Sequence, residues 1–257
     1  MTFQGLVVTG ASRGLGAALA RRFAAPGVRM LLVARSEAPL REVAAGCGSR
    51  GAAVSVAALD VADAAALAAA LAAFESGGPV DLAIANAGIA SGTAPDGSPE
   101  SAGDAARVVA VNLLGAMHLV GPLLPGMRAR GAGSVALVAS LAGLRGLPDC
   151  PAYSASKAGM IAWGEALRAA ESRRGIRVTV ACPGFFESAM GDRFHGWKPL
   201  RLTTEQAAAR VEAAIRAGRG RLAFPGPLAW LARLGAALPP GIGDRAVRGM
   251  RFRVRSE

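Results

Sequence analysis

The sequence has few cysteines and few aromatic residues. Its three cysteines, Cys47, Cys150 and Cys182, are odd in number, which argues against a disulfide framework and fits a reducing cytoplasm. No spacing among these cysteines, His118 and His195 is typical of a zinc site, so we expect no metal ion. Aromatic residues make up 5% of the chain and hydrophobic residues 52%, which is ample for a core with helices on both faces of a sheet.

Long hydrophobic runs are also missing. No apolar run reaches the roughly 20 residues that span a bilayer. The apolar N-terminal stretch is a short strand that leads into a glycine-rich loop and does not resemble a secretory signal. We therefore expect a cytoplasmic protein. Its 257 residues suit one α/β domain, and no repeat or linker divides them, so we expect a single domain over residues 1–257.

Acidic residues are scarce in the C-terminal quarter of the chain. Residues 193–257 hold 13 of the 29 basic residues and only 4 of the 18 acidic ones, within a net charge of +11. Such a segment can face nucleic acid, anionic lipid or an anionic substrate, or can simply be a solvated surface. No nucleic-acid-binding motif accompanies it, so we expect no nucleic-acid partner.

Apolar runs of strand length recur along the chain. They cover residues 4–9, 29–33, 53–57, 81–85, 134–139 and 177–181, and a seventh run at 221–225 is expected at a sheet edge. Helical stretches separate the runs, including an alanine- and leucine-rich one at 62–75, whereas 89–103 has the composition of a loop. This alternation predicts an α/β, doubly wound (Rossmann-type) fold, with a mostly parallel sheet of about seven strands and helices on both faces.

Three glycines follow the first apolar run. Gly10, Gly14 and Gly16 stand between that strand and a run of good helix formers. Glycines let the backbone approach a pyrophosphate closely, and a helix N-terminus offers it free N–H groups and a favourable dipole. The segment is therefore typical of the start of a dinucleotide-binding βαβ unit, although an ordinary tight turn has the same composition.

The residues after the second apolar run bear on the choice of dinucleotide. An acidic residue near this strand end would hold the ribose 2′-hydroxyl of NAD, but Arg35 stands there and Glu37 comes later. Arg13 lies in the glycine loop. Two guanidinium groups suit a 2′-phosphate, since arginine binds phosphate through charge and bidentate hydrogen bonds. We therefore expect NADP(H); the alternative is that both arginines are solvated surface residues.

Tyr153 and Lys157 are four residues apart, so on a helix both side chains project from one face. A phenol has an ordinary pKa near 10 and is a weak acid at neutral pH. A nearby ammonium group favours the phenolate, so we expect Lys157 to lower the pKa of Tyr153 and make the pair a proton-transfer device. Surface helices often carry Tyr and Lys at this spacing, and the pair alone is weak evidence.

Taken together and in order, these motifs resemble the short-chain dehydrogenase/reductase family from residue 3 to about residue 190. The resemblance rests on the glycine loop from Thr9 to Gly16, on Asp60-Val61, on Asn86-Ala87-Gly88, and on Pro183-Gly184. It implies that Asn112, Ser140, Tyr153 and Lys157 are catalytic, with Asn112 supporting a water that refills the proton through Lys157. It also implies a cofactor site made of Gly10, Ser12, Arg13, Gly14, Leu15, Gly16, Arg35, Ser36, Asp60, Val61, Asn86, Ala87, Gly88, Tyr153, Lys157, Pro183, Gly184, Phe186 and Ser188.

One position departs from the family pattern. Where the family often has a threonine four residues after the Pro-Gly glycine, this chain has Ser188. Serine keeps the hydroxyl that bonds the nicotinamide carboxamide but lacks the methyl group that fixes its rotamer.

Two segments remain to be assigned. Residues 185–202 follow the sixth apolar run and are expected to cover the substrate, with Phe185, Met190, Phe194 and Trp197 as apolar groups. Residues 225–257 form a basic C-terminal extension, and its apolar part, 225–240, suits a short helix packed on the core, on a second subunit or on a membrane surface.

The function expected from the resemblance is hydride transfer between NADP(H) and a small-molecule carbonyl or alcohol, as a ketone or aldehyde reductase. The alternatives are a membrane-surface reductase of a lipid-like carbonyl, with peripheral membrane contact, and a non-catalytic NADP-binding regulator. The family commonly forms dimers or tetramers, so a homo-oligomer is expected.

Overall fold

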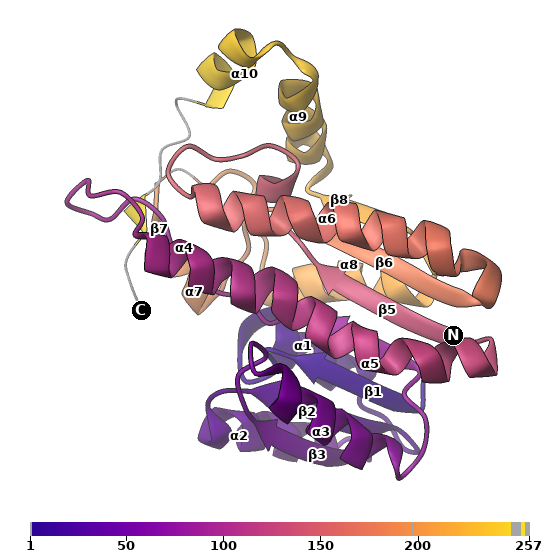
Figure 1. The fold of residues 1–257 in the computed structure, drawn as a ribbon. Coiled ribbons are helices and arrows are strands. Elements are labelled where there is room, and N and C mark those ends of the chain that lie inside the picture. The colour runs from indigo at the N-terminus through magenta and orange to yellow at the C-terminus, as the bar shows by residue number, and fades with distance from the viewer. Residues whose placement is uncertain (1, 197, 248–252, 255–257) are drawn as a thin grey trace.

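A single parallel sheet organises the chain (Figure 1). The computed structural model describes residues 2–196, 198–247 and 253–254. Within them the sheet has seven strands in the order β3-β2-β1-β4-β5-β6-β8. The strands are β1 (Gly5–Thr9), β2 (Arg29–Ala34), β3 (Ala53–Ala58), β4 (Leu82–Ala85), β5 (Gly133–Val138), β6 (Ile176–Pro183) and β8 (Arg221–Phe224). The predicted doubly wound fold is confirmed, including the seventh strand at the sheet edge.

Helices cover both faces of the sheet (Figure 1). One face carries α1 (Gly14–Phe23), α2 (Glu37–Gly48) and α8 (Thr204–Arg216), and the other carries α3 (Ala64–Glu75), α5 (Gly115–Arg130) and α6 (Pro151–Glu171). Helix α4 (Ala102–Val109) continues into α5 through a π-helical turn, η1 (Ala110–Leu114). Two short 3₁₀ turns, η2 (Leu141–Gly143) and η3 (Ser172–Arg174), flank α6.

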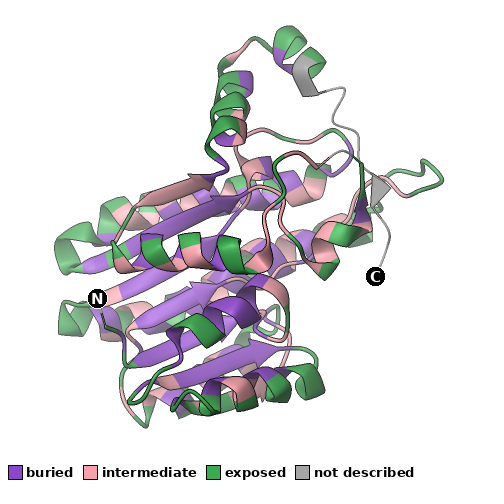
Figure 2. Cartoon of the chain, turned by 180° about the vertical axis from the view of Figure 1, so that it is seen from behind, coloured by how far each residue is buried: buried purple, intermediate pink, exposed green. Residues whose placement is uncertain are grey.

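The core is two apolar layers, one on each side of the sheet (Figure 2). Every residue of β1 and β4 is buried, as expected for parallel strands with helices on both faces. Each helix contributes one apolar stripe to its layer. The buried helical residues include Leu19, Phe23, Leu40, Val211 and Ile215 on one side, and Leu67, Leu71, Leu119, Leu123 and Met160 on the other.

The continuous helix from Ala102 to Arg130 is long and apolar enough, by length and composition, to cross a membrane. Sequence analysis did not single it out, because the segment is helical only when α4, η1 and α5 are joined. In the fold it behaves as a core helix: Leu119, Val120 and Leu123 are at most 1% exposed against the sheet. A core helix passes the same test of length and composition, so that test is weak evidence for a membrane span.

The C-terminal part stands away from the sheet. Helices α9 (Gly226–Ala237) and α10 (Pro240–Val247) form a hairpin that projects beyond the carboxyl ends of the strands and is largely exposed (Figures 1 and 2). The residues before it include α7 (Ala189–Arg193) and β7 (Phe194–His195), and β7 pairs with β9 (Arg253–Val254) in an antiparallel ribbon. Two-residue strands have no detectable periodicity, so the sequence did not predict this pair.

Candidate active site

A deep cavity lies where the winding of the sheet reverses. The chain proceeds from β1 to β2 and β3 on one side and from β4 to β5, β6 and β8 on the other, so the carboxyl ends of β1 and β4 mark the switch point. Ligands of open α/β sheets bind at this edge. Here the structure has a cavity of about 880 Å³ that extends from Gly10 past Tyr153 to helix α9.

The glycine loop and the start of α1 form one end of this cavity. Gly10 and Gly14 have φ angles of +65° and +54°, which L side chains rarely adopt. A Cβ atom on Gly14 would enter open space, with only Ser188 within 4 Å. No side chain caps α1, and its first turn has no acidic residue. The first N–H groups of the helix are therefore not taken by a side-chain cap, and this end suits a pyrophosphate.

Gly16 has a packing role in the glycine loop. A Cβ atom there would lie 2.2 Å from the carbonyl oxygen of Gly10 and 2.4 Å from Nδ2 of Asn86. This glycine therefore lets α1 sit against the glycine loop. It does not line the cavity, and its expected contact with the cofactor stays a prediction.

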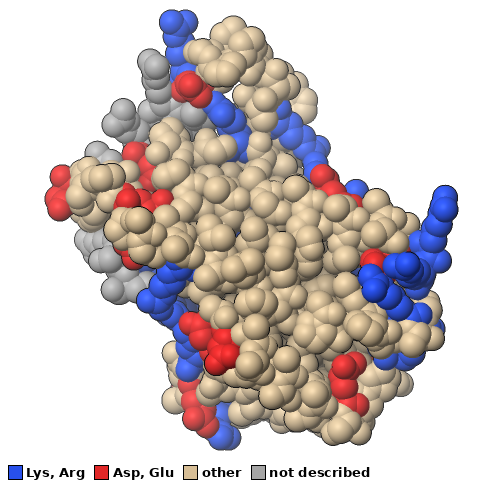
Figure 3. Space-filling view, in the orientation of Figure 1, with Lys and Arg blue, Asp and Glu red and all other residues tan. Residues whose placement is uncertain are grey.

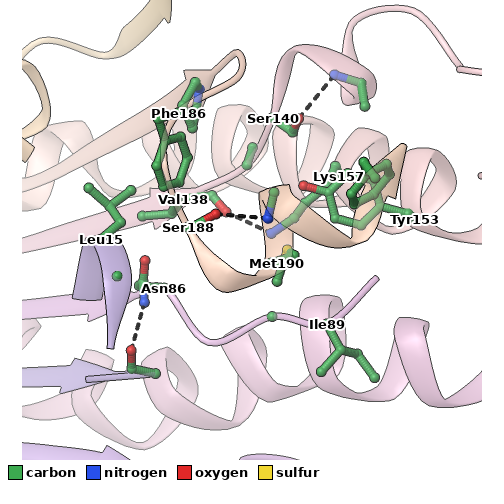
Figure 4. Close-up of a pocket in the computed structure, with 18 of the residues that line it drawn as sticks. Leu15, Asn86, Ile89, Val138, Ser140, Tyr153, Lys157, Phe186, Ser188 and Met190 are labelled. Atoms are coloured by element: carbon green, nitrogen blue, oxygen red, sulfur yellow. Dashed lines mark hydrogen bonds between the residues drawn. The ribbon is translucent and has the colours of Figure 1, made fainter. Parts of the chain in front are cut away.

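Thr9 and Asn86 join the two central strands below the cavity. The Thr9 hydroxyl oxygen accepts hydrogen bonds from the N–H groups of Asn86 (3.1 Å) and Ala87 (3.2 Å), and the hydroxyl donates to the carbonyl of Ile84 (3.3 Å). The Asn86 amide donates to the carbonyls of Thr9 and Gly10, both at 3.1 Å (Figure 4). Asn86, Ala87 and Gly88 line the cavity. Thr9 was not among the predicted site residues, because its bonds are visible only once β1 and β4 pair.

The predicted adenosine end is also assembled. Arg13, Arg35 and Ser36 are arranged around the cavity together with Asp60 and Val61. Both arginines are exposed at its rim. Glu37, the acidic residue nearest to the end of β2, does not line the cavity. Its carboxylate pairs with Arg41, one helical turn further along α2, at 2.6 Å.

Ser140, Tyr153 and Lys157 come together at the centre of the cavity (Figure 4). Tyr153 and Lys157 lie in the first two turns of α6, and Ser140 follows β5. The Ser140 hydroxyl oxygen accepts a hydrogen bond from the N–H of Ala142 at 3.1 Å, and Ser140 lies near enough to the Tyr153 phenol to act on its pKa. Lys157 Nζ donates to the carbonyl of Val138 at 2.8 Å and lies 5.8 Å from the centroid of the Tyr153 ring.

The electrostatics of this group differ from the expectation. Burial raises the pKa of Tyr153 to about 12, and the nearby Ser140 hydroxyl opposes that rise. Burial also lowers the pKa of Lys157 to about 8. The predicted lowering of the phenol pKa by Lys157 is therefore wrong for the chain by itself, since desolvation outweighs the effect of the distant amine.

Asn112 lies behind the cavity and does not line it. Its Oδ1 accepts from the N–H of Ile89 at 2.8 Å, and its Nδ2 donates to the carbonyl of Ile89 and to the hydroxyl of Ser156, both at 3.0 Å. It stands in the π-helical turn, a feature common at functional sites. The side chain thus holds the loop after β4 against α6. Its expected support of a water beside Lys157 stays a prediction.

The loop after β6 closes the end of the cavity where the nicotinamide is expected. Pro183, Gly184, Phe186 and Ser188 all line it, as predicted. The Ser188 hydroxyl oxygen accepts a hydrogen bond from the N–H of Gly191 at 2.9 Å and so caps α7. Its own proton remains available for donation to a ligand.

The predicted substrate-covering residues lie next to Tyr153. Phe185, Met190 and Phe194 line the cavity, and the rings of Phe194 and Tyr153 meet edge to face at 6.0 Å. Trp197 lies outside the described residues. Cys150 does not line the cavity, and burial raises its pKa to about 12, as expected for an inert thiol.

Sequence reasoning missed the outer wall of the cavity. Helix α9 contributes Leu228, Leu231, Ala232, Leu234 and Gly235 to the lining, followed by Leu238. The apolar character of this helix was visible in the sequence, but its position over the cavity was not.

These features define a dinucleotide-binding fold with a serine, a tyrosine and a lysine beside its central cavity. Residues 4–198 match the short chain dehydrogenase family, and the chain belongs to that family of nicotinamide-dependent oxidoreductases. It is 38% identical to an uncharacterized oxidoreductase of Mycobacterium tuberculosis, over 95% of this chain and 98% of that protein. It is 36% identical to the ketoacyl reductase HetN of Nostoc sp., over 72% of this chain and 64% of that protein.

Two solved structures share the fold. A variant of actinorhodin polyketide ketoreductase with NADPH superimposes with a TM-score of 0.77 at 28% identity, covering 88% of this chain and 97% of that one. A short chain dehydrogenase from Mycobacterium paratuberculosis bound to NAD has a TM-score of 0.78 at 22% identity, covering 88% and 98%.

Proposed function

We propose that this protein is an NADP(H)-dependent reductase that converts a ketone or aldehyde into an alcohol and acts as an alcohol dehydrogenase in reverse. The observation that carries the proposal is that Ser140 and Tyr153 line the same cavity, with Lys157 one helical turn after Tyr153. A protein that only binds the dinucleotide does not need a proton donor such as Tyr153 in this cavity. The names of the relatives, among them ketoacyl reductases, support the same reaction class.

Each side chain has a defined part in the proposed reaction. Bound NADPH supplies a hydride to the carbonyl carbon. Tyr153 donates its phenolic proton to the carbonyl oxygen, which becomes the alcohol hydroxyl. Ser140 donates a hydrogen bond to that oxygen and stabilises the negative charge that develops there. A pKa of about 12 keeps Tyr153 protonated at neutral pH, the form that reduction needs.

The reductase reaction is tested with a panel of carbonyl compounds that includes ketoacyl thioesters, following the absorbance of NADPH. Tyr153→Phe removes the proton donor and keeps the ring, so we expect turnover to be lost while NADPH binding is retained. Full turnover by that variant would show that another group donates the proton. Tight NADPH binding by the native protein without turnover of any carbonyl would instead favour the regulator hypothesis.

The preference for NADP(H) rests on Arg13 and Arg35 at the adenosine end of the cavity. A charge-assisted hydrogen bond contributes about 1.5–3 kcal/mol, so Arg35→Ala should raise the Kd of NADPH by about 10- to 150-fold and leave that of NADH almost unchanged. Arg41→Ala is the matched control, because Arg41 is exposed on α2, the helix that begins just after Arg35, but does not line the cavity. Equal losses for both cofactors would refute the assignment.

A second candidate is a reductase that works at a membrane surface. Trp230, Leu231, Leu234 and Ile242 of the α9–α10 hairpin are 43–63% exposed, and the C-terminal quarter is strongly basic. Figure 3 shows the hairpin as largely uncharged atoms with arginine and lysine groups beside it. Apolar side chains together with basic ones are the two signals of a peripheral anchor on anionic lipid.

Flotation with anionic and zwitterionic vesicles tests this candidate. We expect binding to anionic vesicles only, and loss of binding in Trp230→Asp. Leu200→Asp is the control, because Leu200 is 53% exposed away from the hairpin. Absence of flotation in every case would leave a freely soluble, cytoplasmic enzyme. Sedimentation of the same samples tests the homo-oligomer, a dimer or tetramer, that we also propose.

A further inference from the structure

We infer that the substrate carries an extended apolar chain on its carbonyl carbon and that helix α9 binds this chain. The inference rests on the proposed reductase function, and it specifies the substrate class for the same cavity.

The first observation is the face that α9 turns to the cavity. Leu228, Leu231, Ala232, Gly235 and Leu238 line it, and their spacing of three and four residues places them along one side of a helix. From Leu228 to Ala237, where α9 ends, the helix rises about 13 Å. That length matches a chain of many methylene groups and exceeds the reach of a small ketone.

The second observation is the opposite wall. Leu147, Phe185, Met190 and Phe194 also line the cavity. Together with Tyr153 they pack around one small apolar cluster, and the Phe194 ring meets the Tyr153 ring edge to face. The apolar channel therefore begins at the catalytic phenol and continues between this cluster and α9.

The third observation concerns the charges in the channel. Arg145 lines it, and its Nη2 is paired with the carboxylate of Asp244 at 2.6 Å, while its buried Nε has no hydrogen-bond partner among the described residues. Arg193 also lines it and donates to the carbonyl of Ala90 at 3.1 Å. These two arginines are the charged groups on the substrate side of the channel, whereas α9 and the opposite wall are apolar. The carbonyl oxygen of the substrate therefore belongs at Ser140 and Tyr153, and the apolar chain belongs along α9.

The outer end of the channel is open. Leu231 and Leu234 line the cavity and are nevertheless 55% and 43% exposed. A chain longer than the channel can emerge between them, so affinity should rise with chain length and then level off, without a length at which binding fails.

The test is a homologous series of methyl ketones, from 2-butanone upward, assayed with NADPH. Burial of one methylene group contributes about 0.8 kcal/mol, so we expect kcat/KM to rise by up to about fourfold per added methylene before it levels off. Leu231→Asp places a carboxylate in the channel and should flatten this slope to less than about twofold. Ala236→Asp adds the same charge to the exposed side of α9 and should keep the native slope.

A second readout needs no turnover. Binding of 1-alkanols of increasing length to the protein loaded with NADP⁺, measured by calorimetry, should show the same rise and the same loss in Leu231→Asp. Equal reduction of short and long ketones, or equal slopes in both aspartate variants, would overturn the inference and leave the reductase function standing. Failure to reduce any ketone together with a length-dependent alkanol series would refute the function and support the apolar channel.

Discussion

The catalytic tyrosine can be titrated directly, because Tyr153 is the only tyrosine in the sequence. Ionisation of a phenol increases absorbance near 295 nm, and tryptophan does not titrate. The perturbation is a change of pH from 7 to 10 in the folded protein without cofactor. The expected result is almost no change in absorbance.

The magnitude follows from the burial of Tyr153, which raises its pKa to about 12 from an ordinary value of 10.0. At pH 10 an ordinary phenol is half ionised, whereas one with a pKa of 12 is about 1% ionised. Raising the pKa of Tyr153 from 10.0 to about 12 corresponds to about 3 kcal/mol in the free energy of ionising the phenol. Because the folded pKa lies above the unfolded one, this stabilisation is fully present below pH 10 and is lost as the pH rises through 12.

The assay is an absorbance titration with circular dichroism recorded on the same samples. Tyr153→Phe supplies a baseline without any phenol. Ser140→Ala removes the hydroxyl that lowers the pKa, so it should keep Tyr153 protonated to still higher pH. Half-ionisation at pH 10 with an unchanged dichroism spectrum would refute the reasoning, because it would mean that the phenol is solvated in the folded state.

Three further predictions test individual contacts. Lys157→Met should abolish turnover yet increase stability at pH 7 by about 3 kcal/mol in denaturant unfolding, because burial lowers the folded pKa of Lys157 from 10.5 to about 8. The native lysine's contribution is present above pH 10.5 and is lost as the pH falls towards 8, so the gain should vanish above pH 10.5. Gly16→Ala should weaken NADPH binding, measured by fluorescence titration, and should lower the free energy of unfolding by about 1–3 kcal/mol. The reason is that the alanine Cβ would lie 2.2 Å from the carbonyl oxygen of Gly10. Native affinity and native stability in this variant would contradict the packing role. Thr9→Val should lower the free energy of unfolding in urea by about 2–5 kcal/mol, because the N–H groups of Asn86 and Ala87 lose their acceptor. A decrease below about 1 kcal/mol would contradict a structural role of the Thr9 hydroxyl.

Much of the fold could be predicted because its signals are local. Each buried parallel strand is a short apolar run, and the crossover helices have their own composition. The cofactor loop was recognisable because positive φ angles at Gly10 and Gly14 require glycine, so the sequence itself records the backbone conformation. Tyr153 and Lys157 could be paired because four residues on a helix place both on one face.

Other assignments depended on contacts between residues distant in sequence. Only the fold shows that the Asn112 amide forms hydrogen bonds with the backbone of Ile89, 23 residues away. Only the fold shows that Gly16 packs against Gly10 and Asn86. Neither arrangement has a signature within a short window of sequence.

The sequence by itself determined the order of strands and helices, the glycine loop and the residue types at the catalytic centre, because periodicity, backbone conformation and spacing are local properties. Only the tertiary structure decided the direction of the Tyr153 pKa shift, since desolvation depends on everything packed around the phenol. It also decided that α9 forms the wall of the cavity, because an apolar face gives no indication of which surface it will cover.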